Sequence, residues 1–120
     1  MKETLFSLIL FLLIPFYAIS ANPEIILLSP NGGEKYVQGD KMIIKWQYTN
    51  SVSANPVILV LYKNGIKFDT ISESANNTGI FIWDIPVNIT TSERYRVRIR
   101  LKQDLSLNDF SDNDFSIISK

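Results

Sequence analysis

The chain has 120 residues, enough for one domain, and its 12 basic and 12 acidic residues leave no net charge. A neutral domain lacks the electrostatic attraction that nucleic acid or an anionic membrane requires, so we expect no nucleic-acid partner. Because the sequence has no Cys and no His, it excludes a Ser-His-Asp triad, a Cys-His pair and an ordinary zinc site.

Residues 1–20 have the pattern of a secretory signal peptide. Lys2 provides a positive charge, and residues 5–14 form an apolar run. The small residues Ala18 and Ser20 occupy the two positions that a signal peptidase inspects. The run is shorter than the roughly 20 apolar residues of a membrane-spanning helix. We therefore expect residues 21–120 to be a secreted domain with no stable membrane insertion after cleavage. An uncleaved signal anchor is the alternative.

After the leader, short apolar runs with a period of two alternate with turn residues. The runs cover residues 24–29, 42–48, 57–62, 66–71, 80–85, 94–102 and 115–117. Residues 57–62 are apolar at both alternating sets of positions, which predicts a central strand. The Asn64-Gly65 pair that follows is typical of a tight hairpin turn. About seven strands with closely spaced turns predict an all-β, antiparallel sandwich over residues 21–120.

The order of several short motifs is similar to that of one known family. A Pro-Asn-Gly-Gly-Glu turn at residues 30–34 precedes a Gly39-Asp40 turn and the Ile44-Lys45-Trp46 sequence. Later matches follow in order at residues 61–65, 77–79, 83–86, 95–99, 111–112 and 115–117. The chain thus resembles the Kre/Knh-type N-terminal domain, also known as the Ser-Thr-rich glycosylphosphatidylinositol-anchored membrane family.

This resemblance implies an immunoglobulin-like or fibronectin type III-like sandwich. It also implies an extracellular role, because fungal members are implicated in cell-wall β-glucan assembly and others are modules of large secreted or surface proteins. The family brings no catalytic motif to transfer to this chain.

A row of cations is the most prominent candidate binding face. It consists of Arg94, Arg96, Arg98, Arg100 and Lys102, which alternation places on one side of a single strand. The row could hold an acidic polysaccharide or the carboxylates of a protein partner. Alternatively, it is a solvated outer face whose charges are balanced by acids such as Asp84 or Asp114.

Aromatic residues suggest a second kind of contact. Trp46 and Trp83 share their strand faces with aliphatic residues. This pattern favours core positions for both side chains, and a sugar-stacking platform is the alternative. Tyr36, Tyr48 and Tyr62 are therefore the candidate glycan contacts.

Acidic and amide side chains crowd the segment from residue 104 to residue 114, which we expect to be the last loop. Its oxygen-rich residues could hold calcium, but their spacing fits no known calcium loop and is typical of turns. A glycosidase pair of carboxylates would need a cleft that short loops do not offer. We expect no cofactor and no metal.

Two sequons, at Asn76 and Asn88, are candidate N-glycosylation sites in loops between strands. The sequence as a whole predicts a secreted binding module without catalytic activity, which acts at the cell surface, cell wall or extracellular matrix. Its partner would be a polysaccharide or a surface protein. A carbohydrate-binding factor in cell-wall β-glucan assembly and a secreted protease inhibitor are the alternatives.

Overall fold

The structure, a computed structural model, describes residues 22–120, so the predicted signal peptide at residues 1–20 lies outside the described residues. Nine strands form within this range. They are β1 (Ile25–Ser29), β2 (Lys35–Val37), β3 (Lys41–Tyr48), β4 (Val57–Lys63), β5 (Ile66–Ala75), β6 (Ile80–Asp84), β7 (Ser92–Leu101), β8 (Asp104–Phe110) and β9 (Phe115–Ile118). A short 3₁₀ helix, η1 (Asn50–Val52), joins β3 to β4.

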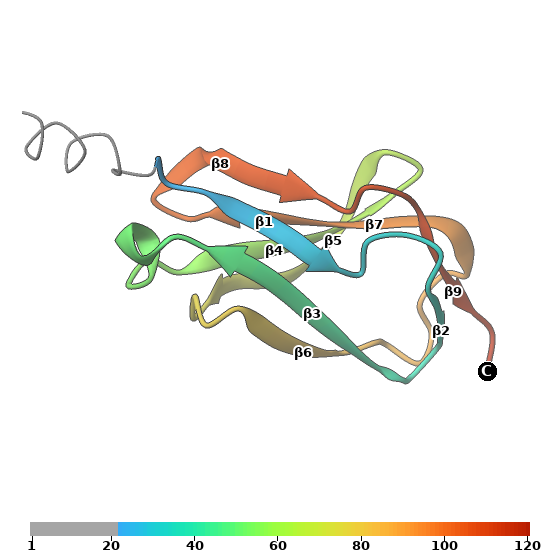
Figure 1. Ribbon diagram of the computed structural model, residues 1–120. Coiled ribbons are helices and arrows are strands. Elements are labelled where there is room, and N and C mark those ends of the chain that lie inside the picture. The colour runs from blue at the N-terminus through green and yellow to red at the C-terminus, as the bar shows by residue number, and fades with distance from the viewer. Residues whose placement is uncertain (1–21) are drawn as a thin grey trace, which may run out of the picture.

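The strands form two sheets that face each other (Figure 1). One sheet has the order β1-β3-β6, and the other has the order β2-β9-β7-β4-β5, with β8 also paired to β7. All pairs are antiparallel except β2 with β9, which is parallel. The predicted all-β sandwich is confirmed, and β4 is central as expected because it lies between β5 and β7.

Alternating side chains from both sheets fill the space between them. On β3, Met42, Ile44 and Trp46 are buried, whereas the residues between them are exposed. On β7 the buried set runs from Tyr95 to Leu101 in the same alternation. Trp83 is half-buried and packs against this core, so both tryptophans lie where the sequence predicts. Burial of these apolar side chains is the main favourable contribution to folding.

One turn and one tyrosine set the geometry of the sandwich locally. Asn64 and Gly65 have φ angles of 53° and 75°, so the predicted hairpin turn joins β4 to β5. The Tyr95 hydroxyl donates a hydrogen bond to the Thr90 carbonyl, five residues earlier. This arrangement resembles the tyrosine corner of immunoglobulin-like domains.

The structure contains two strands that the sequence does not predict. β2 has three residues, too few for a periodic pattern, and it forms by parallel pairing with β9. The expected loop at residues 104–114 is wrong over its first part, because Asp104–Phe110 is β8 and pairs with β7. Asp and Asn have low intrinsic β propensity, and the pairing with β7 overrides it.

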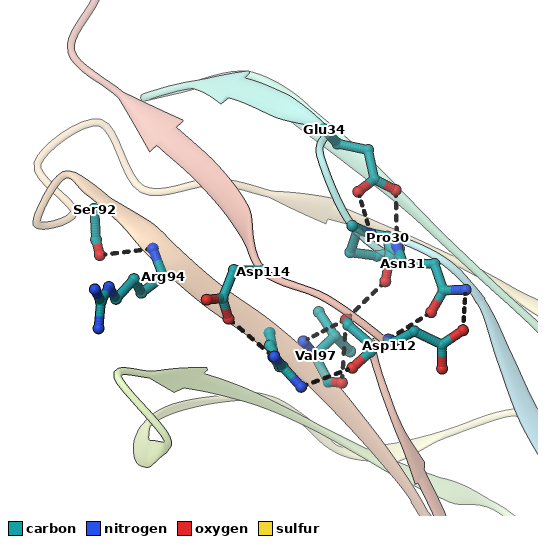
Figure 2. Close-up of polar contacts among 11 residues, drawn as sticks. Pro30, Asn31, Glu34, Ser92, Arg94, Val97, Asp112 and Asp114 are labelled. Carbon is teal, nitrogen blue, oxygen red and sulfur yellow. Dashed lines mark hydrogen bonds and ion pairs between the residues drawn. The ribbon is translucent and has the colours of Figure 1, made fainter.

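The first loop and the segment between β8 and β9 are joined by a dense set of hydrogen bonds, which we call the latch (Figure 2). Its residues are 30–34 and 111–114. At its centre the buried Ser111 hydroxyl accepts a bond from the Val97 amide at 3.0 Å and donates one to the Pro30 carbonyl at 2.7 Å. This one side chain therefore connects β7, the first loop and the segment between β8 and β9.

Other latch bonds align the two segments along their length. The Asn31 side chain donates to the Asp112 carboxylate at 2.9 Å and accepts from the Asp112 amide at 2.8 Å. The Glu34 carboxylate accepts from the amides of Asn31 and Gly32, both at 2.7 Å. The Gly33 amide donates to the Asp114 carbonyl at 2.9 Å. The Pro-Asn-Gly-Gly-Glu motif is thus a structural connection within the sandwich.

The latch predicts that Gly32 cannot be replaced. Its φ is +141°, and an added Cβ would lie 2.6 Å from the Asn113 Cβ. We expect Gly32→Ala to lower the free energy of unfolding by about 3 kcal/mol or more, since steric overlap adds to backbone strain. Gly33→Ala is the matched control, because a Cβ there meets no atom within 4 Å. Its positive φ alone should cost about 1 kcal/mol. Equal losses in urea unfolding would contradict this account.

A buried polar bridge connects the two sides of the sandwich at its other end. The Trp46 indole donates to the Asn77 side-chain carbonyl at 2.8 Å, and the Asn77 amide donates to the Val52 carbonyl at 2.9 Å. Asn77 is only 6% exposed. One amide side chain therefore satisfies both a buried donor and a buried acceptor.

Asn77→Ala should lower the free energy of unfolding by about 2 kcal/mol, because it leaves the buried indole N–H of Trp46 unsatisfied. The Val52 carbonyl loses one bond but still accepts one from the Asn55 amide at 3.0 Å. Urea denaturation followed by tryptophan fluorescence measures the change. Asn76→Ala is the control at the exposed neighbouring position, where a change within about 0.5 kcal/mol is expected. A loss at Asn77 no larger than at Asn76 would show that the bridge does not stabilise the fold.

Candidate functional site

Four of the five cations in the predicted row lie on β7, and Lys102 follows directly after the strand ends. The residues that alternate with them on β7 are buried, namely Tyr95, Val97, Ile99 and Leu101. The row therefore occupies the outer face of the larger sheet. Arg94 and Lys102 are exposed, whereas the three arginines between them are half-buried. The structure thus brings the row together on one face, but with unequal exposure.

Arg98, in the middle of the row, is held by the protein itself. Its guanidinium donates two bonds to the Asn108 side-chain oxygen, at 3.1 and 3.0 Å, and one to the Tyr62 hydroxyl at 3.1 Å. It also lies over the Phe110 ring, 4.7 Å from the centroid. Three of its five donors are therefore occupied within the sheet, and the side chain serves mainly to pack β4, β7 and β8 together.

Arg96 and Arg100 are also engaged. The Arg96 Nε forms an ion pair with the Asp114 carboxylate at 2.8 Å (Figure 2), as the interpretation of a balanced outer face proposed. Arg100 donates to the Leu105 carbonyl at 3.4 and 3.3 Å. The other expected acid, Asp84, is not a partner of the row, because it pairs with Lys41 on the opposite sheet.

Arg94 differs from the other arginines of the row. Among residues 22–120, the Arg94 guanidinium forms no hydrogen bond and no ion pair. The bond that Figure 2 shows for this residue runs from its backbone amide to the Ser92 hydroxyl. Lys102, at the opposite end, likewise has no side-chain partner in this range. The row therefore presents one free charge at each end and no continuous line of free charge.

The antiparallel pairing of β4 with β7 leaves a shallow pocket of about 410 Å³ beside Arg94. The Asn64 amide bonds to the Arg94 carbonyl at 2.9 Å, which places the β4–β5 turn beside this arginine. Tyr62 lies opposite Arg96 across the β4–β7 pair. The pocket is lined by Tyr62, Asn64, Gly65, Arg94, Arg96, Phe110 and Asp114. It combines two cations, one carboxylate and the edges of two aromatic rings.

The three candidate tyrosines lie in separate places. Tyr62 packs edge-on against Phe110, with centroids 4.9 Å apart, and joins the arginine row. Tyr48 lines a second shallow pocket, of about 520 Å³, together with Trp46, Gln47 and Thr78. Tyr36 packs edge-on against the buried Phe115 at 5.6 Å. The structure therefore does not bring the three tyrosines into one glycan-binding platform.

The acidic residues of the expected last loop have separate partners. Asp109 accepts a bond from the Leu27 amide at 2.8 Å, and Asp104 accepts one from the Ser106 hydroxyl at 2.6 Å. Asp112 belongs to the latch, and Asp114 pairs with Arg96. Among residues 22–120, no group of three or more acidic side chains converges as a metal site would require.

Both predicted glycosylation residues are exposed. Asn76 lies between β5 and β6, and Asn88 lies between β6 and β7. Within the described residues, no helix has the length and apolar character needed to cross a membrane.

Sequence reasoning missed Phe110 and the turn as parts of the site. Phe110 was placed in a loop, yet it lies on β8 directly opposite Arg98. The turn at Asn64-Gly65 was predicted, and its nearness to Arg94 could have been inferred by pairing β4 with β7 antiparallel. The tyrosine corner and the order of strands in the two sheets are those of an immunoglobulin-like sandwich domain.

The family model for the Kre9/KNH-like N-terminal Ig-like domain matches residues 29–117. The chain belongs to this family. The match begins just before the Pro-Asn-Gly-Gly-Glu motif and ends in β9, so it covers the latch and every strand except most of β1. No curated protein matches the sequence.

Two solved structures of immunoglobulin-like domains are similar to the chain. The structure of Drosophila OTK extracellular domains 3–5 has a TM-score of 0.45 and 12% identity, with coverage of 83% of this chain and 37% of that one. The structure of the N-terminal four Ig domains of Dscam1 isoform 6.9 has a TM-score of 0.35 and 11% identity, with coverage of 84% and 26%. The chain thus spans between about a quarter and about two fifths of the length of these multidomain structures.

The packing of Tyr36 leads to a testable pH dependence. Burial, followed by the nearby Glu34 charge, raises the pKa of Tyr36 above its usual value, and burial also raises the pKa of Tyr95. Because the unfolded chain then loses these protons at lower pH than the folded chain, the free energy of unfolding falls as pH rises above about 10. Urea unfolding between pH 8 and pH 11 measures this loss. Tyr36→Phe should reduce the slope above pH 10, and an unchanged slope would contradict the assignment.

Proposed function

We propose that this protein is a secreted binding module without catalytic activity, which acts at the cell surface, cell wall or extracellular matrix. Its binding surface is the outer face of the larger sheet around β4, β7 and β8. The observation that carries the proposal is the pocket beside Arg94, where a free guanidinium, an aromatic ring and a carboxylate meet at an exposed turn.

The chemistry of the described residues supports binding over catalysis. The sequence has no imidazole and no thiol, and the four aspartates near the C-terminus are engaged by four different partners. Hydrolysis of a sugar chain needs two carboxyl groups that face each other across a cleft. A rigid sheet that presents polar and aromatic groups is instead suited to recognition, because its contacts are already ordered before the ligand arrives.

A second candidate function is neutral glucan binding in cell-wall assembly. The observation that favours it is the pocket of about 520 Å³ beside Tyr48, which lies at the edge of the smaller sheet. This pocket contains amide and hydroxyl groups from Gln47, Thr49 and Thr78, which are suited to sugar hydroxyl groups. Glu24 is its one charged lining residue, so it offers no cation for an acidic ligand.

The test is binding of the purified protein to a panel of neutral and acidic polysaccharides and to extracts of cell-surface proteins, at low and at physiological salt. We expect saturable, salt-sensitive binding that is weakened by the Arg94→Ala and Arg96→Ala double substitution, because these cations line the proposed surface. Tyr48→Ala is the matched variant on the other pocket and should leave this binding within about twofold.

The outcomes separate the candidates. Salt-insensitive binding to a neutral glucan that is lost in Tyr48→Ala would favour the wall-assembly function over the proposed surface. Release of reducing sugar from any member of the panel would overturn the assignment as a module without catalytic activity. Absence of saturable binding across the whole panel would overturn the proposal.

A further inference from the structure

We infer that the pocket beside Arg94 recognises a single carboxylate-bearing sugar residue, such as a uronate, within an acidic polysaccharide. This inference rests on the proposed function and names the ligand class of the same surface. It differs from the idea of a basic row that attracts any polyanion, because it assigns recognition to one arginine and its surroundings.

The distribution of hydrogen bonds along β7 argues for one anion. Arg98 is bonded to Asn108 and Tyr62, and Arg100 is bonded to the Leu105 carbonyl. Arg96 gives its Nε to Asp114. Within residues 22–120 only Arg94 keeps its whole guanidinium available, and this planar group can bind a carboxylate through two parallel bonds. The free cation Lys102 lies at the opposite end of the row, at the end of β7 away from the pocket.

The surroundings of Arg94 argue for a sugar over an acidic peptide. Asp114 lines the same pocket, and its Oδ1 faces Arg96. An aspartate or glutamate side chain would bring only a carboxylate to the pocket, whereas a sugar ring can also donate a hydroxyl group to Asp114 while its own carboxylate binds Arg94. The Tyr62 ring and the Asn64 amide group add an apolar edge and a neutral donor and acceptor. This mixture matches a ring with several hydroxyl groups and one charge.

The turn leaves room for such a ring. At Gly65, φ is +75° and an added Cβ would meet no atom within 4 Å, so the wall of the pocket is open on this side. The volume of about 410 Å³ lies at the small end of the range for ligand sites, which fits one or two sugar units. An affinity in the millimolar to micromolar range per unit is expected, with tighter binding to polymers that present many units.

The test measures binding of trigalacturonate to the purified protein by backbone amide chemical shifts, with the Gly65 amide as the local reporter. We expect saturable shifts at Gly65 and at least tenfold weaker binding of the fully methyl-esterified trisaccharide, which keeps the rings and loses the charges. Arg94→Ala should weaken trigalacturonate binding roughly tenfold. Lys102→Ala, which removes the other free cation of the row, should change it less than about twofold.

Arg94→Lys keeps the positive charge and removes the planar guanidinium. We expect its affinity for trigalacturonate to lie between those of Arg94→Ala and the wild type, because an ammonium cannot make two parallel bonds to a carboxylate. Since the side chain of Arg94 is exposed and has no bond to any other described residue, these variants should keep the wild-type spectrum outside the pocket. Equal losses in Arg94→Ala and Lys102→Ala would overturn the single-anion site in favour of diffuse attraction. Equal binding of a tri-aspartate peptide would overturn the sugar assignment.

The two proposals can fail separately. If the polysaccharide and protein panel shows saturable binding but Arg94→Ala leaves trigalacturonate binding unchanged, the inference is wrong and the proposed binding module stands. If the panel shows no binding and trigalacturonate causes no shift at Gly65, the proposed function and the inference both fail.

Discussion

The Ser111 hydroxyl is the point on which the rest of the sandwich depends. It is 1% exposed and bonds to two segments that are far apart in sequence, the first loop at Pro30 and the centre of β7 at Val97. An unsatisfied polar group at such a depth is expensive, so the three segments must come together for any of them to be buried. In a domain without disulfides, these buried hydrogen bonds hold the first loop against the last strands, as a covalent cross-link would.

The latch also determines which cations of the outer face are free. Because Gly33 and Asn31 bond to the backbone of Asp114 and Asn113, the chain between β8 and β9 is fixed in place. The Asp114 carboxylate is thereby held beside Arg96, whereas the Arg94 guanidinium, two residues away, has no partner among residues 22–120. The binding properties of the outer face therefore follow from a structural motif on another part of the sandwich. A change in the latch would alter both stability and the charge pattern of the pocket.

The sequence predicted the elements whose pattern is local. Strict alternation along β3 and β7 identified the buried faces, and Asn64-Gly65 identified the hairpin, because positive φ angles restrict the residues allowed there. It did not predict β2 and β8, whose residues have weak strand patterns and are ordered by pairing with β9 and β7. Alternation placed the arginines on one side of β7, but the sequence did not predict that some are bonded within the sheet and one is free. That division depends on Asn108 and Phe110, which reach the row only through the pairing of β8.

The two outer faces of the sandwich differ in a way that bears on function. The outer face of the smaller sheet carries exposed aliphatic residues such as Ile43 and Ile82, which are direct cross-strand partners, with the Lys41–Asp84 ion pair beside them. The larger sheet instead presents the guanidinium groups and the tyrosine and phenylalanine rings around β7. The pocket of about 520 Å³ beside Tyr48 lies where β1 and β3 of this sheet meet the turn at Thr78 and Gly79. Directional recognition needs donors and acceptors that are held in place before binding, and on this protein the bonded arginines of β7 provide that rigid frame around Arg94.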